Sequence, residues 1–238
     1  MIVCIEAQAG LTRWMRDMDP KVQNATQPPA RLGQRYREHR ADAIRKEIID
    51  AAIAEFAERG NLDAPLASIA ERIGTRPSTI YNYFANKQEI LQHAVAETIA
   101  RLSGLMESAV SQVPISLEAV RATGNAFGDH LSDLFFNDPN TLAMLLAVAR
   151  SNEPAVSELW TQWYEQAIGL FEAALNQGIS AGIVRADVDV RSTAIAMTAI
   201  PFGVAACNPA AYAHPEQSQA VVRATTAIFT DGIRPIEA

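Results

Sequence analysis

Apolar residues recur every three or four positions along most of this chain, and this spacing places their side chains on one face of an α-helix. A helix predicted over about residues 41–59 shows the pattern with Ile44, Ile48, Ala51, Ala52 and Phe56. The alternation of apolar and polar residues that indicates a β-strand is nowhere sustained. The pattern therefore predicts an all-α protein.

Two short helices joined by a glycine are predicted over residues 66–84. Gly74 ends the first helix, because glycine readily adopts the positive φ that often closes a helix. The second begins near Pro77, since proline is tolerated in the first turn of a helix. It is predicted to run to about Phe84, with Ile80 and Phe84 on its buried face. This arrangement is typical of a helix-turn-helix, whose second helix enters the major groove of DNA.

Longer helices are predicted after this pair, and start signals such as Ser116 and Asp138-Pro139 support them. Their expected ranges are about 87–113, 116–136, 138–150, 152–180, 189–206 and 215–232. The polar, proline-bearing residues before them, 1–38, show no sustained periodicity and are expected to form a flexible arm.

Residues 45–91 resemble the DNA-binding domain of the tetracycline-repressor-like (TetR/AcrR) regulators. The positions that carry the resemblance are Arg45, Ile48, Ala51, Ala52, Phe56, Gly60, Ile69, Ala70, Gly74, Thr79, Ile80, Tyr81, Tyr83, Phe84, Asn86 and Lys87. The chain departs from the family pattern at Asn61, at the pair Ala64-Pro65 and at Arg76-Pro77-Ser78. Because Arg76 stands where the family has a serine cap, Thr75 is expected to cap the recognition helix.

The resemblance implies an N-terminal three-helix DNA-binding domain, over residues 39–86, and a larger helical ligand-binding and dimerisation domain, over 87–238. The residues predicted to contact DNA are Arg45, Arg76, Pro77, Ser78, Thr79, Tyr81, Asn82, Tyr83 and Lys87. Tyrosine hydroxyls and lysine suit phosphate. Arg76 has donors that suit either a guanine edge or phosphate, and Asn82 has the donor and the acceptor to read adenine.

The net charge of −7 would repel phosphates if it were spread evenly over the chain. Residues 31–101, however, hold eleven Lys and Arg against ten Asp and Glu, whereas residues 102–238 hold six against fourteen. The acidic charge is therefore concentrated outside the predicted DNA-binding domain.

Aromatic and methionine side chains in the C-terminal part predict a cavity for a mostly apolar small molecule. The residues predicted to line it, between the helices over 87–113 and 152–180, are Met106, Phe127, His130, Leu134, Met144, Trp163, Tyr164 and Phe171. The alternative is a tightly packed core without room for a ligand. Apolar and small residues over about 189–232 predict a homodimer interface.

Other classes of protein are not indicated. No apolar run approaches the ~20 residues that span a bilayer, no signal peptide is recognised, and Cys4 and Cys207 suggest neither a disulfide framework nor a zinc site. His130 and Asp133 share a helix face, but no matching acidic–histidine pair accompanies them. We therefore predict a cytoplasmic protein with no catalytic residues, no metal and no cofactor.

The function predicted from these features is a ligand-responsive transcriptional regulator, a repressor released from a palindromic double-stranded DNA operator by a small apolar effector. Two alternatives stay open. One is a DNA-binding protein whose effector is another protein or which has no effector. The other is an all-α small-molecule-binding protein or helical enzyme without DNA activity.

Overall fold

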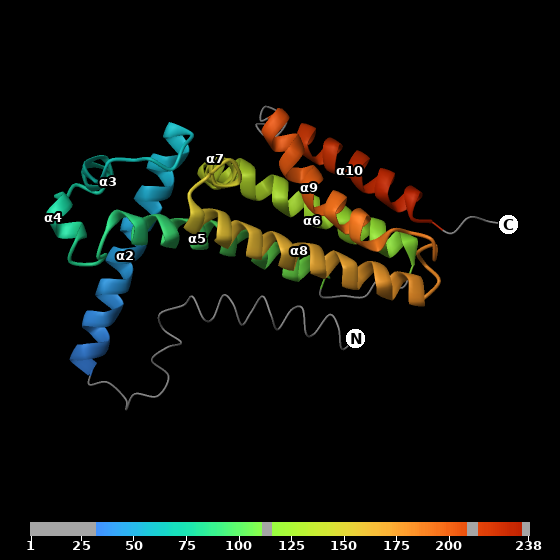
Figure 1. Ribbon diagram of the computed structural model, residues 1–238, viewed down its shortest axis with the longest axis horizontal. Coiled ribbons are helices and arrows are strands. Elements are labelled where there is room, and N and C mark those ends of the chain that lie inside the picture. Colours follow the sequence, from blue (N-terminus) through green and yellow to red (C-terminus); the bar gives the residue numbers. More distant parts are fainter. Residues whose placement is uncertain (1–31, 111–115, 209–213, 235–238) are drawn as a thin grey trace. The chain divides into compact units, whose positions relative to one another are not determined.

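The computed structural model describes residues 32–110, 116–208 and 214–234, and within them every regular element is a helix (Figure 1), as the hydrophobic pattern predicts. The helices are α2 (Leu32–Arg59), α3 (Leu66–Arg72), α4 (Pro77–Ile80), α5 (Lys87–Val110), α6 (Leu117–Asn137), α7 (Pro139–Ala149), α8 (Pro154–Ser180), α9 (Val190–Cys207) and α10 (Pro215–Gly232). None of these helices is both long and apolar enough to cross a membrane.

Contacts between residues divide the described chain into two compact units. The first, the N-terminal unit, holds α2, α3, α4, the beginning of α5, nearly all of α7 and the beginning of α8. The second, the C-terminal unit, holds the rest of α5 and α8 together with α6, α9 and α10. The functional boundary predicted after residue 86 stays a prediction, because contacts alone do not assign function.

Helix α2 begins at Leu32, well before the start predicted near residue 41. The added turns include part of the predicted arm, and their residues 36–40 are all exposed. Nothing in their sequence forms an apolar stripe, but arginine and glutamate are good helix formers. The earlier start therefore reflects helix propensity rather than burial. Residues 1–31 of the predicted arm lie outside the described part of the chain.

Several predicted helix ends are confirmed by capping contacts. The Ser116 hydroxyl accepts a hydrogen bond from the backbone N–H of Ala119 at 3.1 Å at the start of α6. The Asp189 carboxylate accepts from the N–H of Ser192 at 3.0 Å at the start of α9. Each cap satisfies one of the N–H groups that a helix start leaves unpaired.

Helices α6 and α10 lie side by side in the C-terminal unit (Figure 1), and two glycines of α6 allow their close approach. A Cβ atom added at Gly128 would lie 1.8 Å from Cγ1 of Val222. One added at Gly124 would lie 2.8 Å from Cγ2 of Thr226. Both distances are shorter than any ordinary contact, so this packing requires residues without side chains at positions 124 and 128.

We expect Gly128→Ala to lower the free energy of unfolding by about 1–3 kcal/mol, because the added methyl group overpacks the contact between α6 and α10. Gly169→Ala in α8 is the matched control, since no atom lies within 4 Å of its added Cβ. This control should be neutral or more stable by up to about 1 kcal/mol, the usual gain from replacing a helical glycine. Urea denaturation of both variants measures the difference, and equal stabilities would contradict the close packing described above.

Candidate nucleic-acid interface and ligand cavity

The turn between α3 and α4 is built around Gly74, whose φ is 65°. Its N–H donates to the carbonyl of Glu71 at 3.0 Å, and the N–H of Thr75 donates to the carbonyl of Ala70 at 2.9 Å. These bonds use carbonyls that the end of α3 leaves free. The two helices and this turn form the helix-turn-helix predicted from the sequence.

The recognition helix α4 is shorter than predicted, because its α-helical part ends at Ile80 and the expected extension to residue 84 is wrong. The N–H groups of Asn82 and Tyr83 instead donate to carbonyls three positions earlier, at 3.1 and 2.9 Å. This tighter winding is typical of short helical ends. The segment from Tyr81 to Tyr83 therefore continues the helix as turns.

The expected cap by Thr75 is also wrong. The residue that precedes α4 in the N-cap position is Arg76, and it makes no side-chain capping bond. Pro77 follows and has no N–H to offer. A guanidinium has only donors and cannot cap the N–H groups of a helix start, and the Arg76 side chain is exposed.

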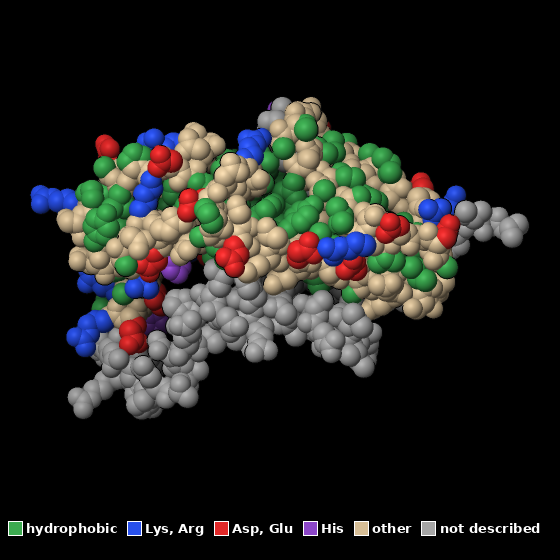
Figure 2. All heavy atoms as spheres, in the orientation of Figure 1, with side chains coloured by type: hydrophobic (Ala, Val, Ile, Leu, Met, Phe, Trp, Pro, Cys, Tyr) green, Lys and Arg blue, Asp and Glu red, His purple; other side chains and the backbone are tan. Residues whose placement is uncertain are grey.

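The residues predicted to contact DNA fall into two groups by exposure. Six of them are exposed: Arg76, Pro77, Ser78, Thr79, Tyr81 and Asn82. Three are half-buried: Arg45, Tyr83 and Lys87. Ile80 and Phe84 are buried, as the spacing predicts, with 0% and 2% of their surfaces exposed. Basic and acidic side chains are interspersed on the visible surface of this unit (Figure 2), in agreement with its near-neutral charge.

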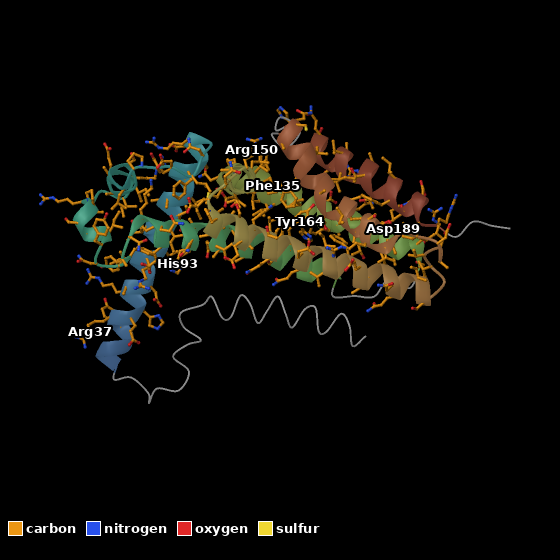
Figure 3. All side chains as sticks on the ribbon, viewed as in Figure 1. Arg37, His93, Phe135, Arg150, Tyr164 and Asp189 are labelled. Atoms are coloured by element: carbon orange, nitrogen blue, oxygen red, sulfur yellow. The ribbon has the colours of Figure 1, made fainter. Side chains whose placement is uncertain are left out.

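Phe84 is held between two side chains from α2 and α5. The Arg45 guanidinium lies 5.8 Å from the centre of the Phe84 ring, within the range of a cation–π contact. The ring of His93, labelled in Figure 3, meets Phe84 edge-on at 5.7 Å. Burial is the main cause that lowers the pKa of His93, and Glu89 opposes this shift. The cation–π contact fixes Arg45 beside the residue that anchors the recognition segment.

A buried carboxylate joins α2 to α3. Glu55, with 7% of its surface exposed, accepts hydrogen bonds from Arg59 at 2.8 Å and from Arg72 at 3.1 Å. Arg72 also donates to the exposed Glu58. The hydrogen bond from Arg59 is the largest cause that lowers the pKa of Glu55, against the effect of burial. Sequence reasoning missed this network; only the i, i+4 spacing of Glu55 and Arg59 signals part of it.

Lys87 is paired with an acid that sequence reasoning also missed. Its Nζ donates to Oδ1 of Asp63 at 2.6 Å, and 91% of the Asp63 side chain is exposed. This hydrogen bond is the main cause that lowers the pKa of Asp63. At the same helix start, the side chain of Asn86 accepts from the N–H of Glu89 at 2.9 Å, which caps α5.

The C-terminal unit contains an apolar cavity of about 120 Å³ between α6, α8, α9 and α10. Among the described residues that line it, none is charged, and the polar side chains are Thr225, Thr226 and Thr230. The hydroxyls of Thr225 and Thr230 already donate to carbonyls of their own helix at 2.9 and 2.8 Å. The cavity therefore suits an apolar ligand.

A smaller cavity of about 20 Å³ shares four lining residues with the first, namely Phe127, Leu131, Phe171 and Met197. Its wall adds Leu102 of α5 and Trp163 of α8. The Trp163 Nε1 donates to the buried Ser103 hydroxyl of α5 at 3.0 Å. The two cavities thus adjoin each other, and the smaller one reaches α5.

The structure brings together some of the predicted ligand residues. Phe127 and Phe171 line both cavities, and Trp163 lines the smaller one. Four of the others do not line either cavity. His130 is exposed, Leu134 and Tyr164 are half-buried, and Met144 is buried in the N-terminal unit. The side chain of Met106 lies outside the described part of the chain. Tyr164, labelled in Figure 3, packs against a buried cluster, and burial raises its pKa.

Much of the cavity wall comes from the two helices that the sequence assigned to dimerisation. Met197, Ile200 and Val204 of α9 line it, as do Val221 and Phe229 of α10. Sequence reasoning missed this role because an apolar stripe does not reveal which neighbour it packs against. Among the described residues, no group of three or more His, Cys, Asp or Glu is placed to hold a metal ion.

Comparison with known proteins identifies the N-terminal region. Residues 48–94 match the family described as bacterial regulatory proteins, tetR family. The fatty acid metabolism regulator protein of Bacillus subtilis (strain 168) is 26% identical over 145 residues, which make up 61% of this chain and 73% of that protein. The HTH-type transcriptional regulator BetI of Brucella canis is 31% identical over 78 residues, 33% of this chain and only 39% of BetI.

A solved structure shares the fold over most of the chain. The transcriptional regulator FadR from Bacillus subtilis, in complex with stearoyl-CoA, superimposes with a TM-score of 0.65 at 19% identity. The superposition covers 79% of this chain and 99% of FadR. The similar proteins named here are transcriptional regulators and not enzymes.

We expect Glu55→Gln to lower the free energy of unfolding at pH 7 by roughly 1–3 kcal/mol, because hydrogen bonds to a charged, buried acceptor are lost. The pKa of Glu55 is held below its ordinary value of 4.5, so the stabilisation is present above that pH. It should disappear as the pH falls from 4.5 through the lowered pKa, and the variant and the parent should then converge.

Glu58→Gln is the matched control, because Glu58 shares the Arg72 partner but 60% of its side chain is exposed. Exposed pairs contribute about 0–1 kcal/mol, so this variant should differ little from the parent at any pH. Denaturation at several pH values measures both variants. A Glu55→Gln effect that is independent of pH would contradict the role assigned to the charge.

Proposed function

We propose that this chain, which belongs to the TetR family of bacterial regulatory proteins, is a homodimeric repressor that an elongated apolar effector releases from a palindromic operator. The observation that carries the proposal is the recognition segment, where buried Ile80 and Phe84 hold six predicted DNA-contacting residues at the surface. Its place of action is the cytoplasm, where bacterial DNA lies.

Two kinds of DNA contact are proposed, one from an exposed side chain and one from two half-buried side chains. The exposed Arg76 guanidinium is proposed to donate to the O6 and N7 atoms of a guanine. Tyr83 and Lys87 lie at the end of the recognition segment and at the start of α5, where a hydroxyl and an ammonium suit phosphate oxygens. The first contact selects sequence, and the others position the protein on the duplex.

The effector that the cavities suit is a long-chain fatty acyl compound. Their walls are apolar and the two cavities adjoin, which favours an elongated hydrocarbon over a compact polar molecule. The fatty acid metabolism regulator of Bacillus subtilis and the FadR complex with stearoyl-CoA support this class of ligand. A full acyl chain is larger than the free cavity, so binding must move the helices that enclose it.

The dimer contact is formed by the outward faces of α9 and α10. Ile195 of α9 is 39% exposed and Ile228 of α10 is 72% exposed, which is unusual for large apolar side chains. Their neighbours Met197, Val221 and Phe229 face the cavity. The same two helices therefore serve the cavity with one face and the partner subunit with the other.

Helix α5 is the element through which the effector changes DNA binding. It begins at Lys87 and continues without a break to the region of Leu102 and Ser103. A ligand that displaces Trp163 breaks its hydrogen bond to Ser103 and favours a different position of α5. A tenfold loss of DNA affinity needs only about 1.4 kcal/mol of differential affinity between the two states.

Selection of bound sequences from a random duplex library should enrich a palindrome, because two identical subunits present two recognition segments. Arg76→Ala should relax the preference at one position of each half-site and cost about 1–3 kcal/mol of binding free energy per contact. Arg191→Ala is the control, since it removes one exposed charge from the C-terminal unit. If the purified dimer enriches no sequence, the proposed function is wrong.

Stearoyl-CoA, used as a probe, should weaken binding to the selected duplex at least tenfold. Met197→Trp should abolish this response while leaving DNA binding intact, because Met197 lines both cavities and the larger ring fills the space between them. Met197→Leu keeps the volume and should respond like the parent protein. Fluorescence anisotropy of labelled duplex, with and without stearoyl-CoA, measures both variants. An unchanged response of Met197→Trp would place the effector elsewhere.

A further inference from the structure

Asp63 presents a carboxylate directly to the lysine that the proposed function assigns to DNA phosphate. The distance from Lys87 Nζ to Asp63 Oδ1 is 2.6 Å, and the lysine side chain is 40% exposed. Within the described residues, Lys87 is the hydrogen-bond partner of this carboxylate. The acid therefore occupies the position that a phosphate oxygen would take on the ammonium group.

The loop before α3 fixes Asp63 in this position. The backbone N–H of Asp63 donates to the Asn61 side-chain oxygen at 2.9 Å, which forms a local turn. The Asn61 amide also donates to the carbonyl of Arg59 at 3.3 Å, and the next residue, Ala64, is completely buried. The turn at Asn61 and the buried Ala64 together fix the backbone of Asp63, whose carboxylate contacts Lys87 at the start of α5.

The ion pair is too exposed to contribute much to folding. Pairs between exposed side chains stabilise a protein by about 0–1 kcal/mol. On DNA the pair has a different consequence, because a lysine that keeps a carboxylate partner offers phosphate less net positive charge and one fewer free N–H donor.

We propose that Asp63 is an affinity-setting residue that pairs with Lys87 in the free protein and so weakens the binding of DNA of every sequence. The inference rests on the proposed function. The weakening is the same for all sequences, since phosphate contacts do not distinguish bases. On DNA of random sequence, where phosphate contacts supply the affinity, the protein then binds too weakly to stay bound. At the operator, contacts to the bases offset the lost affinity.

The test is Asp63→Asn in the full-length protein, measured on a labelled random-sequence 30-bp duplex between 50 and 200 mM salt. Freeing Lys87 should add one phosphate contact per bound subunit, so the slope of log K against log salt should steepen by about 0.9 per subunit. The dissociation constant near 0.1 M salt should fall roughly fivefold to tenfold per subunit, as that slope implies.

Asp187→Asn is the matched control. Asp187 is an exposed acid of the C-terminal unit that pairs with Arg185 at 3.4 Å, and the substitution removes the same charge. It should leave the salt slope unchanged. An equal gain in affinity from both variants would show that net charge alone matters and would overturn the role of Asp63.

Lys87→Met distinguishes pairing from simple repulsion. If Asp63 acts by occupying Lys87, adding Asp63→Asn to Lys87→Met should change the affinity by less than about twofold. A gain as large as in the parent protein would mean that the carboxylate repels phosphate directly, and the proposal would be wrong. Failure of the proposed function gives a different result, because neither the parent protein nor Asp63→Asn would then bind any duplex.

Discussion

The recognition segment depends on the burial of Ile80 and Phe84, because a helix of four residues cannot hold its own shape. Two side chains contact the ring of Phe84, Arg45 from α2 and His93 from α5. Gly74 sets the direction in which the segment leaves α3, and the Glu55 network holds α3 against α2. The groups proposed to face DNA are therefore positioned by a packed domain and not by the stability of α4 itself.

A comparable constraint acts in the C-terminal unit. Gly124 and Gly128 let α10 approach α6 closely, and the apolar cavity lies beside that contact. Helices α9 and α10 then have two tasks, since one face encloses the cavity and the other exposes Ile195 and Ile228. A ligand that widens the cavity must move helices that also form the proposed dimer contact. If the proposed dimer contact forms, this double use couples effector binding to the arrangement of the subunits.

Local features of the fold could be predicted from the sequence, because they depend on residues close together in the chain. The apolar periodicity predicted the helices, and Ser116 predicted the start of α6. The limits of α10 were predicted at Pro215 and Gly232, where the structure has them. The early start of α2 was missed because its first turns, residues 32–40, show no apolar stripe. The end of α4 was missed because periodicity cannot separate an α-helix from consecutive tight turns.

The contacts that no local pattern reveals are the pairs between distant residues. Arg72 is 17 positions from Glu55, and Lys87 is 24 positions from Asp63, so neither partner can be chosen from spacing alone. These two pairs differ in what they do. Glu55 is buried, so its charge must be matched for the domain to fold. Asp63 is exposed, so folding gains little from its pairing with Lys87. An acid that adds little to stability, yet pairs with the lysine assigned to phosphate, fits the proposed role of setting the strength of DNA binding.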